Sequence, residues 1–94
     1  MKVAKIYPTN EQGHVIEIGR ATWDDDETSV RNRYPTSNGG FSPRSSSELP
    51  VRDLDTLLGA VAAEDLIKPE ALAGMISALS ASLHRQLIPK DLPA

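Results

Sequence analysis

The spacing of hydrophobic positions changes near the middle of the chain. In the first half they tend to alternate with polar positions, as in half-buried β-strands, and turn-forming residues separate the alternating segments. In the second half they recur every three or four residues, which is the spacing of one helix face. The pattern predicts strands up to about residue 47 and helices after it.

Three segments of the first half have a strand pattern. Residues 2–7 alternate loosely and carry β-forming side chains, residues 14–23 are rich in β-branched side chains, and residues 29–34 alternate strictly. Residues 41–44 are expected to add a short edge strand, where Pro43 need not donate a hydrogen bond.

Gly19 interrupts the second of these strands. We expect a β-bulge there, because glycine inside a strand often marks one. Such a bulge would shift the register and turn a set of apolar side chains toward one core, drawn from Ile16, Ile18, Ala21 and Trp23.

Two helices are predicted over residues 50–66 and 69–87. Each begins at a proline, Pro50 or Pro69, which suits the first helical position because that amide needs no partner. Pro89 ends the second helix. The stripe of the second helix consists of Leu72, Met75, Ile76, Leu79, Leu83 and Leu87.

Strands followed by helices predict an α+β domain, in which two helices pack on one face of an antiparallel sheet of three to four strands (ββββαα). We expect a single domain over residues 1–94, with the sheet over 2–47 and a frayed tail over 88–94. So small a chain commonly buries more apolar surface by forming a homodimer. The predicted dimer interface is Leu72, Met75, Ile76, Leu79 and Leu83.

Composition narrows the classes of function. The chain has 10 Lys and Arg against 13 Asp and Glu, for a net charge of -3, which argues against a protein that coats duplex DNA. It has no cysteine, so thiolate catalysis and cysteine-bound zinc are excluded. The sequence also contains neither a signal peptide nor an apolar stretch of membrane-spanning length. We therefore expect a cytoplasmic protein that does not bind membranes.

No catalytic or cofactor motif assembles from the remaining residues. His14 and His84 lie far apart in the sequence, and no nucleophile motif accompanies either of them. The acidic run at residues 24–27 lacks the alternate spacing and the glycine of a calcium loop, so a solvated turn is the preferred interpretation. We expect a protein that is not an enzyme and that has no cofactor, metal site or catalytic residue.

Arginines and aromatic residues gather around the third predicted strand. Alternation places Arg31 and Arg33 on one face of that strand. Guanidinium groups bind the phosphates of single-stranded nucleic acid, and aromatic rings stack on its bases. The predicted nucleic-acid-binding residues are Arg20, Trp23, Arg31, Arg33, Tyr34, Phe41 and Arg44, and Arg20 has a secondary role together with Arg52. A solvated strand face, with Trp23 and Tyr34 in the core, is the alternative.

Trp23 and Asp24 form a tryptophan before an acidic turn, residues 30–34 form an arginine strand, and residues 47–58 form the entry into a helix. With this pattern, about half of the chain resembles the transcriptional positive cofactor 4 (Whirly-like) family of single-stranded DNA-binding proteins and its small bacterial relatives. The resemblance implies a curved four-stranded antiparallel sheet, dimerisation through helices, and binding of single-stranded DNA across the sheets.

The sequence therefore leads to two hypotheses of function. The first is a small dimeric protein that binds single-stranded DNA in transcription, replication or repair. The alternative is a protein-interaction module, such as a phage- or plasmid-type adaptor or inhibitor, which binds a protein partner through its acidic surface and helical stripe.

Overall fold

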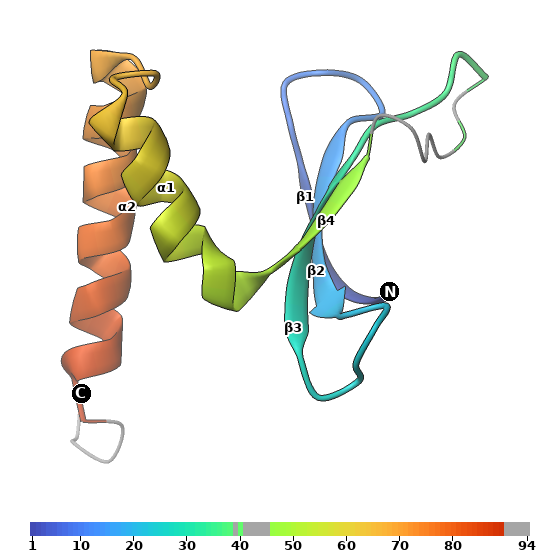
Figure 1. Ribbon diagram of the computed structural model, residues 1–94, viewed down its shortest axis with the longest axis horizontal. Coiled ribbons are helices and arrows are strands. Elements are labelled where there is room, and N and C mark those ends of the chain that lie inside the picture. The colour runs from blue at the N-terminus through green and yellow to red at the C-terminus, as the bar shows by residue number, and fades with distance from the viewer. Residues whose placement is uncertain (39, 41–45, 90–94) are drawn as a thin grey trace. The chain divides into compact units, whose positions relative to one another are not determined.

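A computed structural model describes residues 1–38, 40 and 46–89. Four strands are followed by two helices, as predicted, and the ββββαα order is confirmed (Figure 1). The strands are β1 (Lys2–Pro8), β2 (Val15–Arg20), β3 (Thr28–Arg33) and β4 (Ser47–Pro50). After a 3-10 turn at Val51–Asp53, the helices are α1 (Leu54–Ala63) and α2 (Pro69–Leu87). The chain divides into two units, Met1–Leu57 and Leu58–Ala94, and each is described by itself.

The sheet is an antiparallel meander in the order β1-β2-β3-β4. The fourth strand begins at Ser47, and the edge strand expected at residues 41–44 lies outside the described residues. Pro50 ends β4 in an extended conformation, and helical structure starts one residue later than expected, at Val51. A proline is tolerated there because β4 is an edge strand.

The bulge predicted at Gly19 is wrong, since the irregularity lies in the neighbouring strand. Pairing of β2 with β3 continues unbroken through Gly19 and Ser29, whereas β1 changes register between Val3 and Lys5. The glycine serves another purpose, because a Cβ atom at this position would lie 2.0 Å from the carbonyl oxygen of Lys2. Gly19 therefore allows a close approach of β1, which explains why glycine interrupts the strand pattern.

The two faces of the sheet differ in chemistry. Residues directly opposite each other in an antiparallel pair share a face, and successive residues of a strand alternate between faces. One face carries Glu17, Ser29, Arg31, Arg33 and Glu48, and we call it the polar face. The other carries a row of opposed apolar residues with a neighbour on β2, and we call it the apolar face; its members are Ile16, Ile18, Val30 and Leu49.

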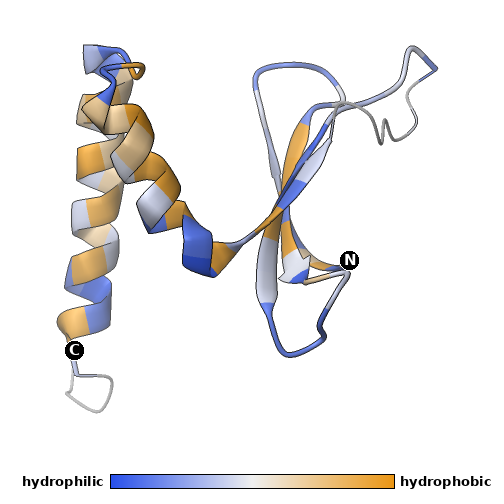
Figure 2. Ribbon diagram, in the orientation of Figure 1, coloured by the Kyte–Doolittle hydropathy of each residue, from blue (hydrophilic) through white to orange (hydrophobic). Residues whose placement is uncertain are grey.

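Burial in the described residues is concentrated around polar groups. Ala21 is the one buried hydrophobic residue among them, while Glu17 and Ser29 are the buried polar ones. Of the apolar set expected to share a core, Trp23 is half-exposed. Hydrophobic residues lie along both helices (Figure 2), yet neither helix has a buried residue. The packing of the helices on one face of the sheet stays a prediction.

The second helix has the bounds that its sequence predicts. Pro69 occupies the first turn, after Lys68 in an extended conformation, and the helix ends at Leu87, before Pro89. The first helix is shorter than the predicted 50–66, because α1 ends at Ala63 and Asp65 has a positive φ of 54°. Within the described ranges, no helix is long and apolar enough to cross a membrane.

Candidate nucleic-acid interface

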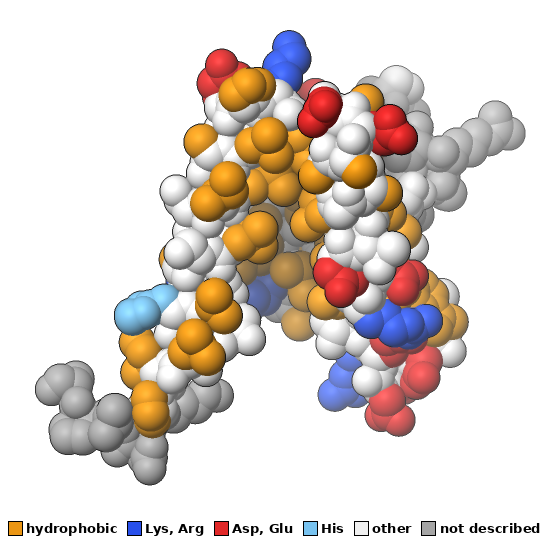
Figure 3. All heavy atoms as spheres, turned by 60° about the vertical axis from the view of Figure 1, so that its left-hand side comes forward, with side chains coloured by type: hydrophobic (Ala, Val, Ile, Leu, Met, Phe, Trp, Pro, Cys, Tyr) orange, Lys and Arg blue, Asp and Glu red, His pale blue; other side chains and the backbone are white. Residues whose placement is uncertain are grey.

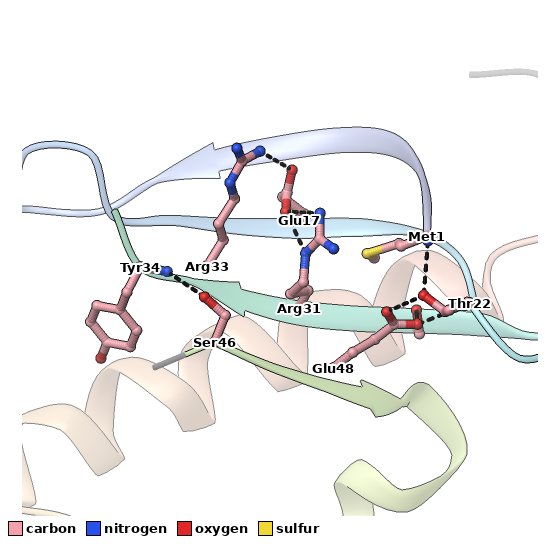
Figure 4. A network of polar contacts seen from close by, with 9 residues as sticks. Met1, Glu17, Thr22, Arg31, Arg33, Tyr34, Ser46 and Glu48 are labelled. Atoms are coloured by element: carbon pink, nitrogen blue, oxygen red, sulfur yellow. Dashed lines mark hydrogen bonds and ion pairs between the residues drawn. The ribbon is translucent and has the colours of Figure 1, made fainter. Parts of the chain in front are cut away.

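The centre of the polar face is a buried carboxylate held by two arginines. Glu17 has 1% of its surface exposed. The Nε of Arg31 donates to its Oε1 at 2.8 Å, with Nη2 of the same arginine 2.7 Å from that oxygen. Arg33 donates from Nη1 to Oε2 at 3.2 Å (Figure 4). Each carboxylate oxygen of Glu17 therefore faces one guanidinium group.

Strand register brings these three residues together. Glu17 on β2 lies directly opposite Arg31 on β3, and Arg33 follows two residues along on the same face. A buried carboxylate without a partner would be very costly, and the two guanidinium groups give each oxygen of Glu17 a partner. Glu48 lies directly opposite Arg31 on the same face, so the polar face carries two arginines and two glutamates. The arginine pair is thus both fixed in position and partly neutralised.

A second carboxylate organises the other end of the polar face. Glu48 accepts hydrogen bonds from the Thr22 amide at 2.8 Å, the Thr22 hydroxyl at 2.7 Å and the Ser29 hydroxyl at 2.9 Å. The amino terminus of Met1 donates to the same Thr22 hydroxyl at 2.8 Å (Figure 4). Burial by itself would raise the pKa of the Glu48 carboxyl. The hydrogen bonds from Thr22 and Ser29 and the charge of the amino terminus outweigh it, so the pKa lies below its ordinary value of 4.5.

Tyr34 belongs to the opposite side of the sheet from the arginines. Figure 4 shows its ring pointing away from Arg33, as strand alternation requires. The ring stacks on His14, with centroids 4.1 Å apart and planes 5° from parallel. The Nε2 of His14 contacts Oδ1 of Asn32, which holds the imidazole beside the Tyr34 ring. One face of the Tyr34 ring is therefore already covered.

Trp23 lies in the turn between β2 and β3, outside any core. Half of its surface is exposed, at 50%, and its indole N–H donates to Oε2 of Glu27 at 2.6 Å. Arg52 pairs with the same glutamate from the start of the 3-10 turn. The alternative interpretation placed Trp23 in the core, and its exposure argues against that placement.

The structure brings together only part of the predicted binding set. Arg31 and Arg33 share the polar face, whereas Arg20 is opposite Lys2 and shares the face of Ile16 and Ile18. Phe41 and Arg44 lie outside the described residues. Trp23 and Tyr34 lie beyond the two ends of β3, the strand that carries both arginines.

Sequence reasoning missed Glu17, Glu48 and His14. The signal for Glu17 was incomplete, because a hairpin of residues 14–23 with 29–34 can set either the Val15 face or the Ile16 face opposite the arginines. The exact partner depends on the register, which the turn between the strands decides. The contacts of Glu48 come from Thr22 and Ser29, which are 26 and 19 residues away, so no local pattern indicates them.

The predicted dimer residues fall into two groups along α2. Leu72 and Met75 are half-buried, whereas Ile76, Leu79 and Leu83 are exposed. Leu87 is also exposed and extends the stripe by one turn beyond the predicted interface. Figure 3 shows hydrophobic side chains along the length of this helix.

Other sites in the described residues carry little chemistry. No group of three or more His, Asp or Glu side chains there could hold a metal ion. A hollow beside the β1–β2 turn is lined by Gln12, Gly13, Pro35, Thr36 and Ser37, none of which is ionisable. The polar face is therefore the candidate site with the most charged groups.

Comparisons with family models, with curated proteins and with solved structures found no match to this chain. The resemblance to the transcriptional positive cofactor 4 family stays a prediction that rests on the residues quoted for it.

Proposed function

We propose that this protein binds single-stranded DNA on the polar face of its sheet and acts as a homodimer. The observation that carries the proposal is the arginine pair of β3, which Glu17 holds on one face. Guanidinium groups fixed in advance lose less side-chain entropy when they bind a phosphate. Arg33 is the more accessible of the two, with 38% of its side chain exposed against 18% for Arg31.

Aromatic rings at both ends of β3 support the same function. Trp23 precedes the strand and is half-exposed, and Tyr34 directly follows Arg33. A single strand of DNA that follows β3 on the polar face, and bends around the end of β3 at Arg33, would reach Trp23 at one end and Tyr34 at the other. Stacking on such a ring contributes about 1–3 kcal/mol per base and tolerates any base. We therefore expect little sequence preference.

Electrostatics predicts a modest affinity that depends on salt. The polar face carries two arginines and two glutamates, and the whole chain has a net charge of -3. Phosphate contacts release counterions, so the logarithm of the binding constant falls with the logarithm of salt by about 0.7 per phosphate contact on a single strand.

The test is fluorescence anisotropy of a labelled oligothymidine. Replacing an arginine alone would leave Glu17 buried with fewer partners, so the variant combines Glu17→Gln, Arg31→Gln and Arg33→Gln. The matched control is Lys5→Gln on β1, which lies on the opposite face of the sheet, because both variants change the net charge by -1. We expect the triple variant to bind at least ~10-fold more weakly, since one charged hydrogen bond contributes about 1.5–3 kcal/mol. We expect the control to stay within about 2-fold, because it loses no phosphate contact.

Two results would contradict the proposal. One is a wild-type protein that does not bind oligothymidine at low salt. The other is a triple variant that is folded by circular dichroism and binds as the wild type does.

A protein-interaction module is the second candidate, and the exposed stripe of α2 is the observation that favours it. Purification of the chain with one specific protein, together with no binding of oligothymidine, would decide for this candidate.

A further inference from the structure

The exposed hydrophobic side chains of α2 form one continuous stripe. The fraction of surface exposed is 66% for Ile76, 57% for Leu79, 59% for Leu83 and 71% for Leu87. Their spacing of three, four and four residues keeps them on one side of the helix. Contiguous exposed apolar surface of this kind marks an interaction site.

Half-burial shows which part of the hydrophobic surface of α2 is covered. Within the unit that begins at Leu58, a short turn joins the end of α1 to the start of α2 (Figure 1). From Leu58 onward, the half-buried apolar residues of the two helices are Leu58 and Val61 in α1 and Leu72 and Met75 in α2. Since Met75 lies on the other side of the stripe from Ile76, the remaining edge has no cover within this unit.

Three exposed residues of the stripe and the half-buried Leu72 have self-complementary spacing. Leu72, Ile76, Leu79 and Leu83 are separated by four, three and four residues, a pattern that reads the same in both directions. An antiparallel copy, related by a two-fold axis between Ser77 and Ala78, therefore presents matching positions. These four residues also have the alternating three- and four-residue spacing of a coiled-coil seam.

In such a pair, Leu72 lies opposite Leu83 of the partner subunit and Ile76 lies opposite Leu79 of the partner subunit. The contact is isologous and closes after two copies, as in most homodimers.

The charges at the helix ends favour the antiparallel direction. The first turn of α2 contains Glu70, and the last turn contains His84 and Arg85. An antiparallel pair sets the acidic end of one helix beside the basic end of the other and also opposes the two helix dipoles favourably. A parallel pair would set like ends together.

We infer that α2 of one chain packs antiparallel against α2 of a second copy through Ile76, Leu79, Leu83 and Leu72. This inference rests on the homodimer of the proposed function and gives it a geometry. It makes no use of the arginine pair, so DNA binding and self-association fail or succeed separately.

The experiment uses single cysteines, because the chain has none of its own. In the antiparallel pair, the two copies of residue 79 are separated by about 4.5 Å along the helix axis, from a rise of about 1.5 Å per residue. The two copies of residue 87 are separated by about 28 Å along the axis. A disulfide needs Cα atoms within about 7 Å of each other. We expect Leu79→Cys to form a cross-linked dimer under mild oxidation and Leu87→Cys to form none.

The molar mass of the wild-type protein, measured by light scattering after size exclusion, completes the test. We expect the mass of a dimer. The side chains of Leu79 and Leu87 are both exposed, so neither cysteine variant removes a core residue. Cross-linking of both variants would indicate a parallel pair and overturn the inference. A monomer at micromolar concentration that cross-links at neither position would overturn it as well, while the oligothymidine titration would still report on the proposed function.

Discussion

At the scale of single residues, two glutamates organise the polar face, and they do so in different ways. Glu17 is buried between two guanidinium groups, whereas Glu48 is half-buried and accepts hydrogen bonds from neutral groups of Thr22 and Ser29. The sequence predicts that Arg31 and Arg33 share a face, because alternation alone decides it. It does not predict either glutamate as their neighbour, because cross-strand contacts depend on register and chain reversal.

The lowered pKa of Glu48 predicts a loss of stability in acid. The carboxyl binds a proton less readily in the folded state than in the unfolded state, where its pKa is near 4.5. Its contribution to the free energy of unfolding is therefore complete above the unfolded pKa and is lost as pH falls through the folded one. In urea unfolding between pH 7 and pH 3, Glu48→Gln should lose less stability than the wild type below about pH 4.5. The same loss in both proteins would contradict the role given to Glu48.

At the scale of elements, local spacing predicted more than pairing did. The strands at residues 2–7 and 29–34 and the helix at 69–87 were predicted correctly, because each has a periodic pattern of its own. The bulge was assigned to the wrong strand. Gly19 is a glycine because the backbone of β1 approaches it closely, and the register change lies in β1. A packing partner that is distant in sequence leaves no periodic signal.

Two glycine substitutions test the close approach of β1 to Gly19, because they should change the free energy of unfolding in opposite directions. In Gly19→Ala the new Cβ would lie 2.0 Å from the Lys2 carbonyl oxygen, so β1 must move. We expect a loss of at least about 2 kcal/mol in the free energy of unfolding. At Gly59 in α1, a new Cβ would meet nothing within 4 Å, so Gly59→Ala should raise stability by up to about 1 kcal/mol. Urea unfolding of both variants measures the difference, and equal changes would contradict the close approach at Gly19.

At the scale of the whole molecule, the described residues bury few hydrophobic side chains, and the apolar stripe of α2 is left exposed. The sequence already indicated that this apolar surface needs a partner, because a chain of 94 residues has a small core and its last helix has a long apolar stripe. A dimer through α2 would supply the missing cover, and it would place two copies of the arginine pair in one particle. Two linked sites on one nucleic-acid strand bind more tightly than either alone.

The most direct test of the central claim is a titration of labelled oligothymidine with the wild-type protein, repeated at increasing salt and with a duplex of the same length. We predict binding at low salt that weakens steeply as salt rises, and weaker binding of the duplex, whose bases cannot stack on Trp23 or Tyr34. No binding of the single strand at low salt, or equal affinity for both forms, would contradict the account.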